Sequence, residues 1–173
     1  MPAEGAGTTE GPRSLLAAAP STPLFFGAEL AYAMLFGKDG DTYQNGLGGV
    51  FSLGYALSGR LGLVVEAQYA TFTQRGLVPG RLEFLSVAAG ARFTQALGAR
   101  AALTLGATLG LSTFGVRGLA DAGGLAVGLR CDLSVSLART LQLTVGLSPA
   151  LAAGPTAGTS FYLPLRAGLT FLL

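Results

Sequence analysis

Large apolar side chains occupy every second position along two long stretches of the chain. Between Arg100 and Thr113 the odd positions hold leucine or alanine, and the even positions hold glycine, alanine, serine or threonine. The same alternation runs from Gly124 to Leu137. A period of two indicates extended strands with one uniformly apolar face. Because the second face is small and polar rather than charged, it cannot form a water-exposed surface, so we expect the apolar face to meet lipid.

The composition of the chain supports a membrane environment. Only 12% of the 173 residues are charged and 50% are hydrophobic, whereas ordinary soluble domains have roughly 25% charged residues. The uncharged apolar stretches are broken by proline or glycine, or are shorter than the roughly 20 residues that a membrane-spanning helix needs. An open sheet edge is too costly in hydrocarbon, so strands can span a membrane only as a closed barrel.

Strand candidates and turn signals alternate along the chain from residue 24 onwards. Eight candidates cover about residues 24–36, 47–57, 61–73, 82–94, 100–113, 124–137, 141–151 and 161–173. Tight turns at 58–60, 95–98 and 138–140 alternate with longer loops at 38–46, 74–81, 115–124 and 153–160. The sequence therefore predicts an all-β fold, a transmembrane eight-stranded antiparallel up-and-down β-barrel over residues 23–173. Short turns of such barrels face the periplasm and the longer loops face outside.

Residues 1–22 are rich in glycine, proline, alanine and threonine and show no strand periodicity. They predict a flexible N-terminal tail on the periplasmic side. No secretory signal is visible, because Ser14–Ala19 is too short and follows an acidic start. Either a signal peptide has been removed from this sequence or the outer-membrane location is wrong, and we favour removal.

Aromatic residues on the apolar face lie near the predicted strand ends. They are Phe26, Tyr55, Phe93 and Phe171 at the ends joined by tight turns, and Phe36 and Phe161 at the ends joined by longer loops. Such a distribution is typical of the two interfacial girdles of membrane barrels. Ordinary strand aromatics are the alternative interpretation.

The final eight residues, 166–173, resemble the assembly signal of bacterial outer-membrane barrels. The matching residues are Arg166, Gly168, Phe171 and Leu173, the last standing where phenylalanine is commoner. The segment Leu61–Tyr69 (LGLVVEAQY) also resembles the third strand of small OmpA-like barrels. The resemblance covers residues 24–173. It implies an eight-stranded barrel in the outer membrane of a Gram-negative cell envelope, surrounded by lipid and inserted by the barrel-assembly machinery. It does not identify a molecular activity.

Seven charged residues fall on the lumen side of the predicted strands. They are Glu29, Glu66, Arg92, Arg100, Arg130, Asp132 and Arg166. Four arginines against three acids predict an interior network of ion pairs and hydrogen bonds, because unpaired buried charges are costly. Packing of the lumen is one interpretation, since eight strands leave just enough interior space for side chains. A gate or selectivity element is the other.

Enzymatic chemistry finds little support. The chain has no histidine, which removes serine–histidine–aspartate arrangements and most catalytic metal sites. Glu29 and Glu66 could act as an acid–base pair, but charge balance with the inward arginines explains them more simply. Cys131 is the only cysteine and falls on the apolar face. We expect no enzyme, no cofactor and no metal, and the net charge of +2 without a basic run makes nucleic acid an unsuitable partner.

The leading hypothesis is a non-enzymatic outer-membrane barrel with a structural, anchoring or envelope-interaction role. A small-solute pore is the first alternative. A barrel subunit of a larger envelope complex is the second, with loops 38–46 and 115–124, the outer wall or the tail as contact surfaces for a protein partner. A soluble lipid-carrying barrel is the structural alternative, but its exterior would then be the small and polar face.

Overall fold

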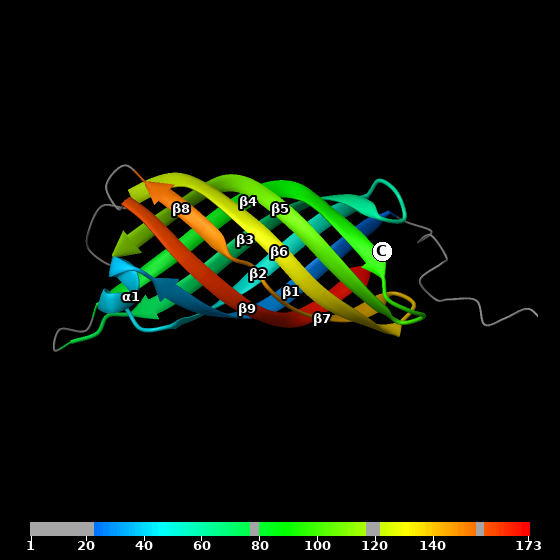
Figure 1. The fold of residues 1–173 in the computed structure, drawn as a ribbon, viewed down its shortest axis with the longest axis horizontal. Helices are drawn as coiled ribbons and strands as arrows, with labels where there is room; N and C mark the ends of the chain where they lie inside the picture. The colour runs from blue at the N-terminus through cyan, green and yellow to red at the C-terminus, as the bar shows by residue number, and fades with distance from the viewer. Residues whose placement is uncertain (1–22, 77–79, 117–121, 155–157) are drawn as a thin grey trace, which may run out of the picture.

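The computed structural model describes residues 23–76, 80–116, 122–154 and 158–173. One antiparallel sheet rolls up until its first strand pairs with its last, which closes a barrel (Figure 1). The elements are β1 (Leu24–Phe36), α1 (Lys38–Thr42), β2 (Gly46–Ala56), β3 (Leu61–Thr73), β4 (Arg81–Ala96), β5 (Ala101–Val116), β6 (Ala122–Ala138), β7 (Leu141–Leu147), β8 (Ala150–Gly154) and β9 (Gly158–Leu172). The predicted 1–22 tail lies outside the described residues.

Strands β7 and β8 together occupy the seventh position of the barrel. Both pair with β6 on one side and with β9 on the other. Leu147 pairs with Leu165 and Ala150 pairs with Tyr162, so the register continues across the two intervening residues of each strand. The predicted eight strands are therefore present as eight positions around the barrel.

Two prolines explain why the seventh strand is interrupted. The Leu129 amide donates to the Pro149 carbonyl at 2.9 Å, and the Ser148 amide donates to the Pro164 carbonyl at 3.0 Å. Neither proline has an N–H with which to return the bond. Each proline therefore removes one ladder hydrogen bond, Pro149 on the β6 side and Pro164 on the β9 side.

The two faces of the wall follow the predicted alternation. In β1 the side chains from Leu24 to Phe36 are alternately accessible and buried. Leu30 on the outer face is 78% exposed, whereas the next residue, Ala31, which faces the lumen, is 3% exposed. Exposed leucine, valine and phenylalanine side chains cover the outside of the strands all around the barrel. In water such a surface would drive aggregation, so it fits a hydrocarbon solvent.

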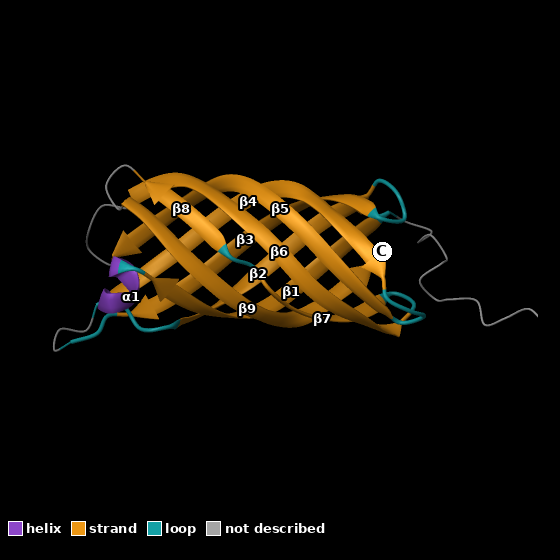
Figure 2. Ribbon diagram, in the orientation of Figure 1, coloured by secondary structure: helices purple, strands orange, loops and turns teal. Residues whose placement is uncertain are grey.

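The two ends of the barrel differ. One end carries the tight turns at residues 57–60, 97–100 and 139–140, and we call it the turn end. The opposite loop end carries α1, which stands out as the purple element of Figure 2. The predicted loop at 38–46 thus contains a short helix, and the predicted loop at 153–160 is shorter because β8 reaches Gly154 and β9 begins at Gly158. No helix of the described residues is long and apolar enough to cross a membrane.

Three layers of side chains fill the lumen. A buried apolar cluster fills the loop end, with Ala33, Leu35, Ala70, Phe72, Leu82, Phe84, Ala126, Ala150, Ala152 and Tyr162. Charged side chains occupy the middle. Threonine and serine hydroxyls line the turn end, where Thr144 lies 3.1 Å from Ser134 and 3.3 Å from Thr170, oxygen to oxygen. The interior is therefore a packed core of changing polarity.

Candidate functional site

Five of the predicted lumen charges meet in the middle of the barrel. They come from four strands: Glu29 from β1, Glu66 from β3, Arg130 and Asp132 from β6, and Arg166 from β9. We call these five residues the charge cluster. Each lies near the middle of its strand. Each points inward because it falls on the alternate positions of the strand that carry small residues and face the lumen.

Arg130 is the centre of the charge cluster. Its Nη2 donates to Glu29 Oε1 at 2.5 Å. Its Nη1 donates to Glu66 Oε1, and its Nε donates to Asp132 Oδ2. Each nitrogen of the guanidinium thus binds a different carboxylate, and two of these partners are distant in sequence.

Arg166 completes the charge cluster from the last strand. Its Nη2 donates to Asp132 Oδ1 at 2.8 Å. Its Nη1 lies 3.4 Å from Glu29 Oε2 and 4.0 Å from Glu66 Oε1. The two guanidinium groups therefore share all three carboxylates, an arrangement in which each buried charge has an opposite charge beside it.

Glycines on the neighbouring strands make room for these side chains. Gly146 pairs with Asp132, and a Cβ at Gly146 would overlap the Asp132 carboxylate. Gly168 pairs with Glu29, and a Cβ there would overlap the β1 backbone at Ala28 and Glu29. A larger residue at either position would displace the wall or the carboxylate, so the glycines are part of the site.

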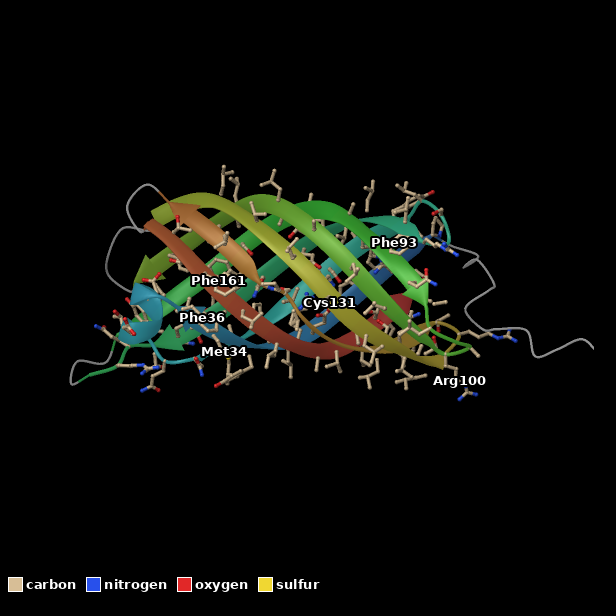
Figure 3. The ribbon with its side chains drawn as sticks, in the orientation of Figure 1. Met34, Phe36, Phe93, Arg100, Cys131 and Phe161 are labelled. Atoms are coloured by element: carbon tan, nitrogen blue, oxygen red, sulfur yellow. The ribbon has the colours of Figure 1, made fainter. Side chains whose placement is uncertain are left out.

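Two of the predicted lumen arginines lie outside the charge cluster. Arg92 stacks its guanidinium carbon 3.2 Å from the centre of the Phe25 ring, on the turn-end side of the lumen. Arg100 is exposed in the turn before β5 (Figure 3). The structure thus removes Arg100 from the predicted lumen set. Three arginines and three acids remain inside, so the interior charges balance.

The charge cluster is almost completely shielded from solvent. The side chains of Glu29 and Arg166 are 1% exposed, that of Asp132 is 2% exposed, and even Glu66 reaches only 13%. Buried charges of this kind are stable only when each has partners. Across the described ranges, no three histidine, cysteine, aspartate or glutamate residues gather in a way that could hold a metal ion.

An aromatic layer closes the lumen above the charge cluster, on its loop-end side. We define this aromatic layer as Phe72, Phe84, Phe114 and Tyr162. The Phe84 ring lies 4.8 Å from the Phe114 ring and 4.6 Å from the Tyr162 ring, centre to centre. Phe72 and Phe84 are each 1% exposed. The prediction of a small and polar lumen face omitted these residues, although Phe84 and Tyr162 share the parity of their inward neighbours.

A small cavity separates the charge cluster from the aromatic layer. Its volume is about 20 Å³, and Glu66, Gln68, Ser148 and Tyr162 are among its lining residues. The Tyr162 hydroxyl donates to Gln68 Oε1 at 3.0 Å across its edge. A space of this size holds about one water molecule, so it offers no room for a solute.

The four residues of the predicted assembly signal make different contacts at the C-terminal end of the chain, where β9 pairs with β1. Arg166 enters the charge cluster and Gly168 approaches β1. Phe171 lies on the outer face with its ring 6.5 Å from that of Phe26, centre to centre. The Leu173 amide donates to the Leu24 carbonyl at 3.0 Å. All four therefore lie at the seam where the last strand meets the first.

Comparison with known proteins reveals a shared fold. No protein-family model matches the sequence, and no curated protein matches it. The crystal structure of Neisserial surface protein A is similar with a TM-score of 0.74 at 19% identity, over 88% of this chain and 98% of that chain. The outer membrane protein OprG from Pseudomonas aeruginosa gives 0.57 at 13% identity, over 88% and 96% of the two chains.

These likenesses confirm the predicted fold, a small eight-stranded antiparallel up-and-down β-barrel like those of the two outer-membrane proteins. The apolar outer wall of this barrel fits a surrounding of lipid. At these identities the comparisons carry the fold alone, so the role of the barrel is argued from its own residues.

Proposed function

We propose that the chain is a non-enzymatic outer-membrane barrel with a closed lumen and a structural or anchoring role in the cell envelope. The observation that carries this proposal is the double closure of the interior. The charge cluster fills the middle of the lumen, and the aromatic layer fills its loop end. A solute would have to displace both.

The charge cluster supports a structural role over a gate. A gate needs a charged group that can exchange partners at moderate cost. Here Arg130 contacts three carboxylates from three strands, and Arg166 contacts the same three. Moving either guanidinium would leave several buried charges without partners, which costs several kcal/mol per charge.

The same contacts argue against catalysis by the predicted Glu29 and Glu66 pair. A general acid or base must reach a proton on a substrate within hydrogen-bond distance. Both carboxylates instead accept from Arg130, and the cavity beside Glu66 has a volume of about 20 Å³. The chain also lacks histidine, the commonest acid–base residue.

Insertion by the barrel-assembly machinery belongs to this proposal, with Arg166, Gly168, Phe171 and Leu173 as the residues recognised. The support is that β9 closes the barrel by pairing with β1, so recognition and closure involve the same strand. Outer-membrane lipid then surrounds the wall. An envelope protein partner stays a prediction; of its predicted contact surfaces, residues 117–121 and the tail lie outside the described residues.

Single-channel recording of the full chain in planar bilayers tests the closed lumen against the pore. We expect no reproducible conductance steps. Arg130→Gln alters the middle of the lumen, and Arg100→Gln is a matched control outside it.

The two variants make each result informative. Wild-type steps that change with Arg130→Gln and not with Arg100→Gln would establish a pore through the lumen and overturn the proposal. Steps that neither variant changes would arise outside the lumen, and the lumen would remain closed.

A further inference from the structure

Each tight turn at the turn end carries one arginine. They are Arg60 between β2 and β3, Arg100 between β4 and β5, and Arg139 between β6 and β7. All three residues are exposed. We call these three residues the arginine collar.

Among the described side chains, the arginine collar is a group of charges of one sign. Around the loop end, the described side chains carry both signs of charge: Arg75 and Arg81 occur with Asp39, Asp41 and Glu83. The lumen also holds charges of both signs. Among the described residues, no aspartate or glutamate lies at the turn end.

The apolar outer wall extends up to the arginine collar. Leu61 follows Arg60 directly and is 52% exposed, Leu97 precedes Arg100 by three residues and is 58% exposed, and Leu137 is 59% exposed two residues before Arg139. Figure 3 shows Phe93 and Arg100 at the same end of the barrel. The arginines therefore lie where a hydrocarbon-facing surface stops, which is the depth of lipid headgroups.

The spacing of the turns determines what the arginine collar can bind. Successive turns are two strands apart around the barrel, which is roughly 10 Å or more at about 4.8 Å per strand. The three turns therefore lie at separate places around the wall. The binding surface is a ring of arginines around the wall rather than a pocket.

We propose that the arginine collar binds the phosphate groups of anionic phospholipids in the leaflet at the turn end. A guanidinium matches phosphate oxygens with paired hydrogen bonds. The ring arrangement favours lipid over an acidic protein, because lipid surrounds the wall at all three turns whereas a protein would need one contiguous patch. This inference goes beyond the proposed structural role, and its failure would leave that role untouched.

The test compares lipid association in nanodiscs made of phosphatidylcholine. The full chain is reconstituted, and a spin-labelled phosphatidylglycerol is compared with spin-labelled phosphatidylcholine as a probe of lipids in contact with the wall. We expect wild type to prefer the anionic probe, by an amount on the order of fivefold for each arginine site. The preference should fall at high salt. It should also be lost in the triple variant Arg60→Gln, Arg100→Gln, Arg139→Gln.

The variant Arg75→Gln, Arg81→Gln is the matched control, because it removes arginines from the loop end and leaves the arginine collar intact. It should keep the preference. Equal association of both probes with wild type, or a preference that survives in the triple variant, would overturn the proposal. The wild-type and salt measurements need no variant, so the test stands even if a variant folds poorly.

Discussion

At the scale of single residues, Arg130 determines how the lumen is neutralised. Its three side-chain nitrogens each bind a different carboxylate. The side chain is 9% exposed, so water cannot take the place of these contacts without a large cost in free energy. The stability of the barrel should therefore depend on this one guanidinium more than on any arginine at the surface.

Arg130→Met should destabilise the barrel by about 3–5 kcal/mol, because it removes one member of a buried charge group and leaves carboxylates unpaired. Urea unfolding in lipid vesicles measures the change. Arg81→Met is the control, and its effect should stay within about 0.5 kcal/mol because the residue is exposed at the loop end, outside both the charge cluster and the arginine collar. Equal effects of the two substitutions would mean that the charge cluster does not stabilise the fold.

The depth of a side chain on the outer wall should set the cost of charging it. Leu109 lies near the middle of β5 and is 60% exposed, and Leu137 lies at the turn end of β6 with 59% exposed. Leu109→Arg should cost about 2–4 kcal/mol and Leu137→Arg about 0–1 kcal/mol in a bilayer unfolding assay. Because exposure is matched, only depth distinguishes the two. Similar costs would contradict a membrane-spanning wall.

At the scale of elements, the period of two was enough to place the strands. The predicted bounds of β1 and β3 match the structure, since the alternation in both ends at clear turn or loop residues. Arg100 was misplaced because parity applies only within a strand, and β5 begins one residue later. The pairing of Arg130 with Glu29, 101 residues apart, depends on the register around the whole barrel, which no local pattern contains.

The interruption between β7 and β8 should be removable. Pro149→Val would supply an N–H opposite Leu129 and restore one ladder hydrogen bond. We expect a gain of about 1 kcal/mol in the free energy of unfolding. Hydrogen exchange should show a protected amide at position 149. If the amide at position 149 exchanged as fast as one in an open loop, the missing hydrogen bond of Pro149 would not be the cause of the interruption between β7 and β8.

At the scale of the whole molecule, charge and polarity are separated by region. Among the described residues, the outer wall is apolar, the lumen holds three arginines against three acids, and the turn end carries the three arginines of the collar. This distribution is expected of a protein whose outer wall is in contact with lipid rather than water. It excludes the soluble lipid-carrying barrel, because large apolar side chains cover the exterior instead of the interior.

The purified chain should give a far-UV circular dichroism spectrum dominated by β structure in detergent micelles. Removal of the detergent should precipitate it, because leucine, valine and phenylalanine side chains cover the outer wall. A sample kept in detergent is the control. A monomer that stays soluble without detergent would contradict the assignment of the outer wall to lipid.

The seam between β1 and β9 has a kinetic consequence. Arg166 arrives on the last strand, yet its partners Glu29 and Asp132 belong to strands synthesised earlier. Until the ends of the sheet meet, Glu29 on β1 lacks both of its guanidinium partners, Arg130 and Arg166, and a partly built wall is penalised electrostatically as well as by its open edge. Closure of the barrel and pairing of Glu29 therefore coincide, so we expect the barrel to assemble cooperatively and slowly, without a persistent half-formed sheet.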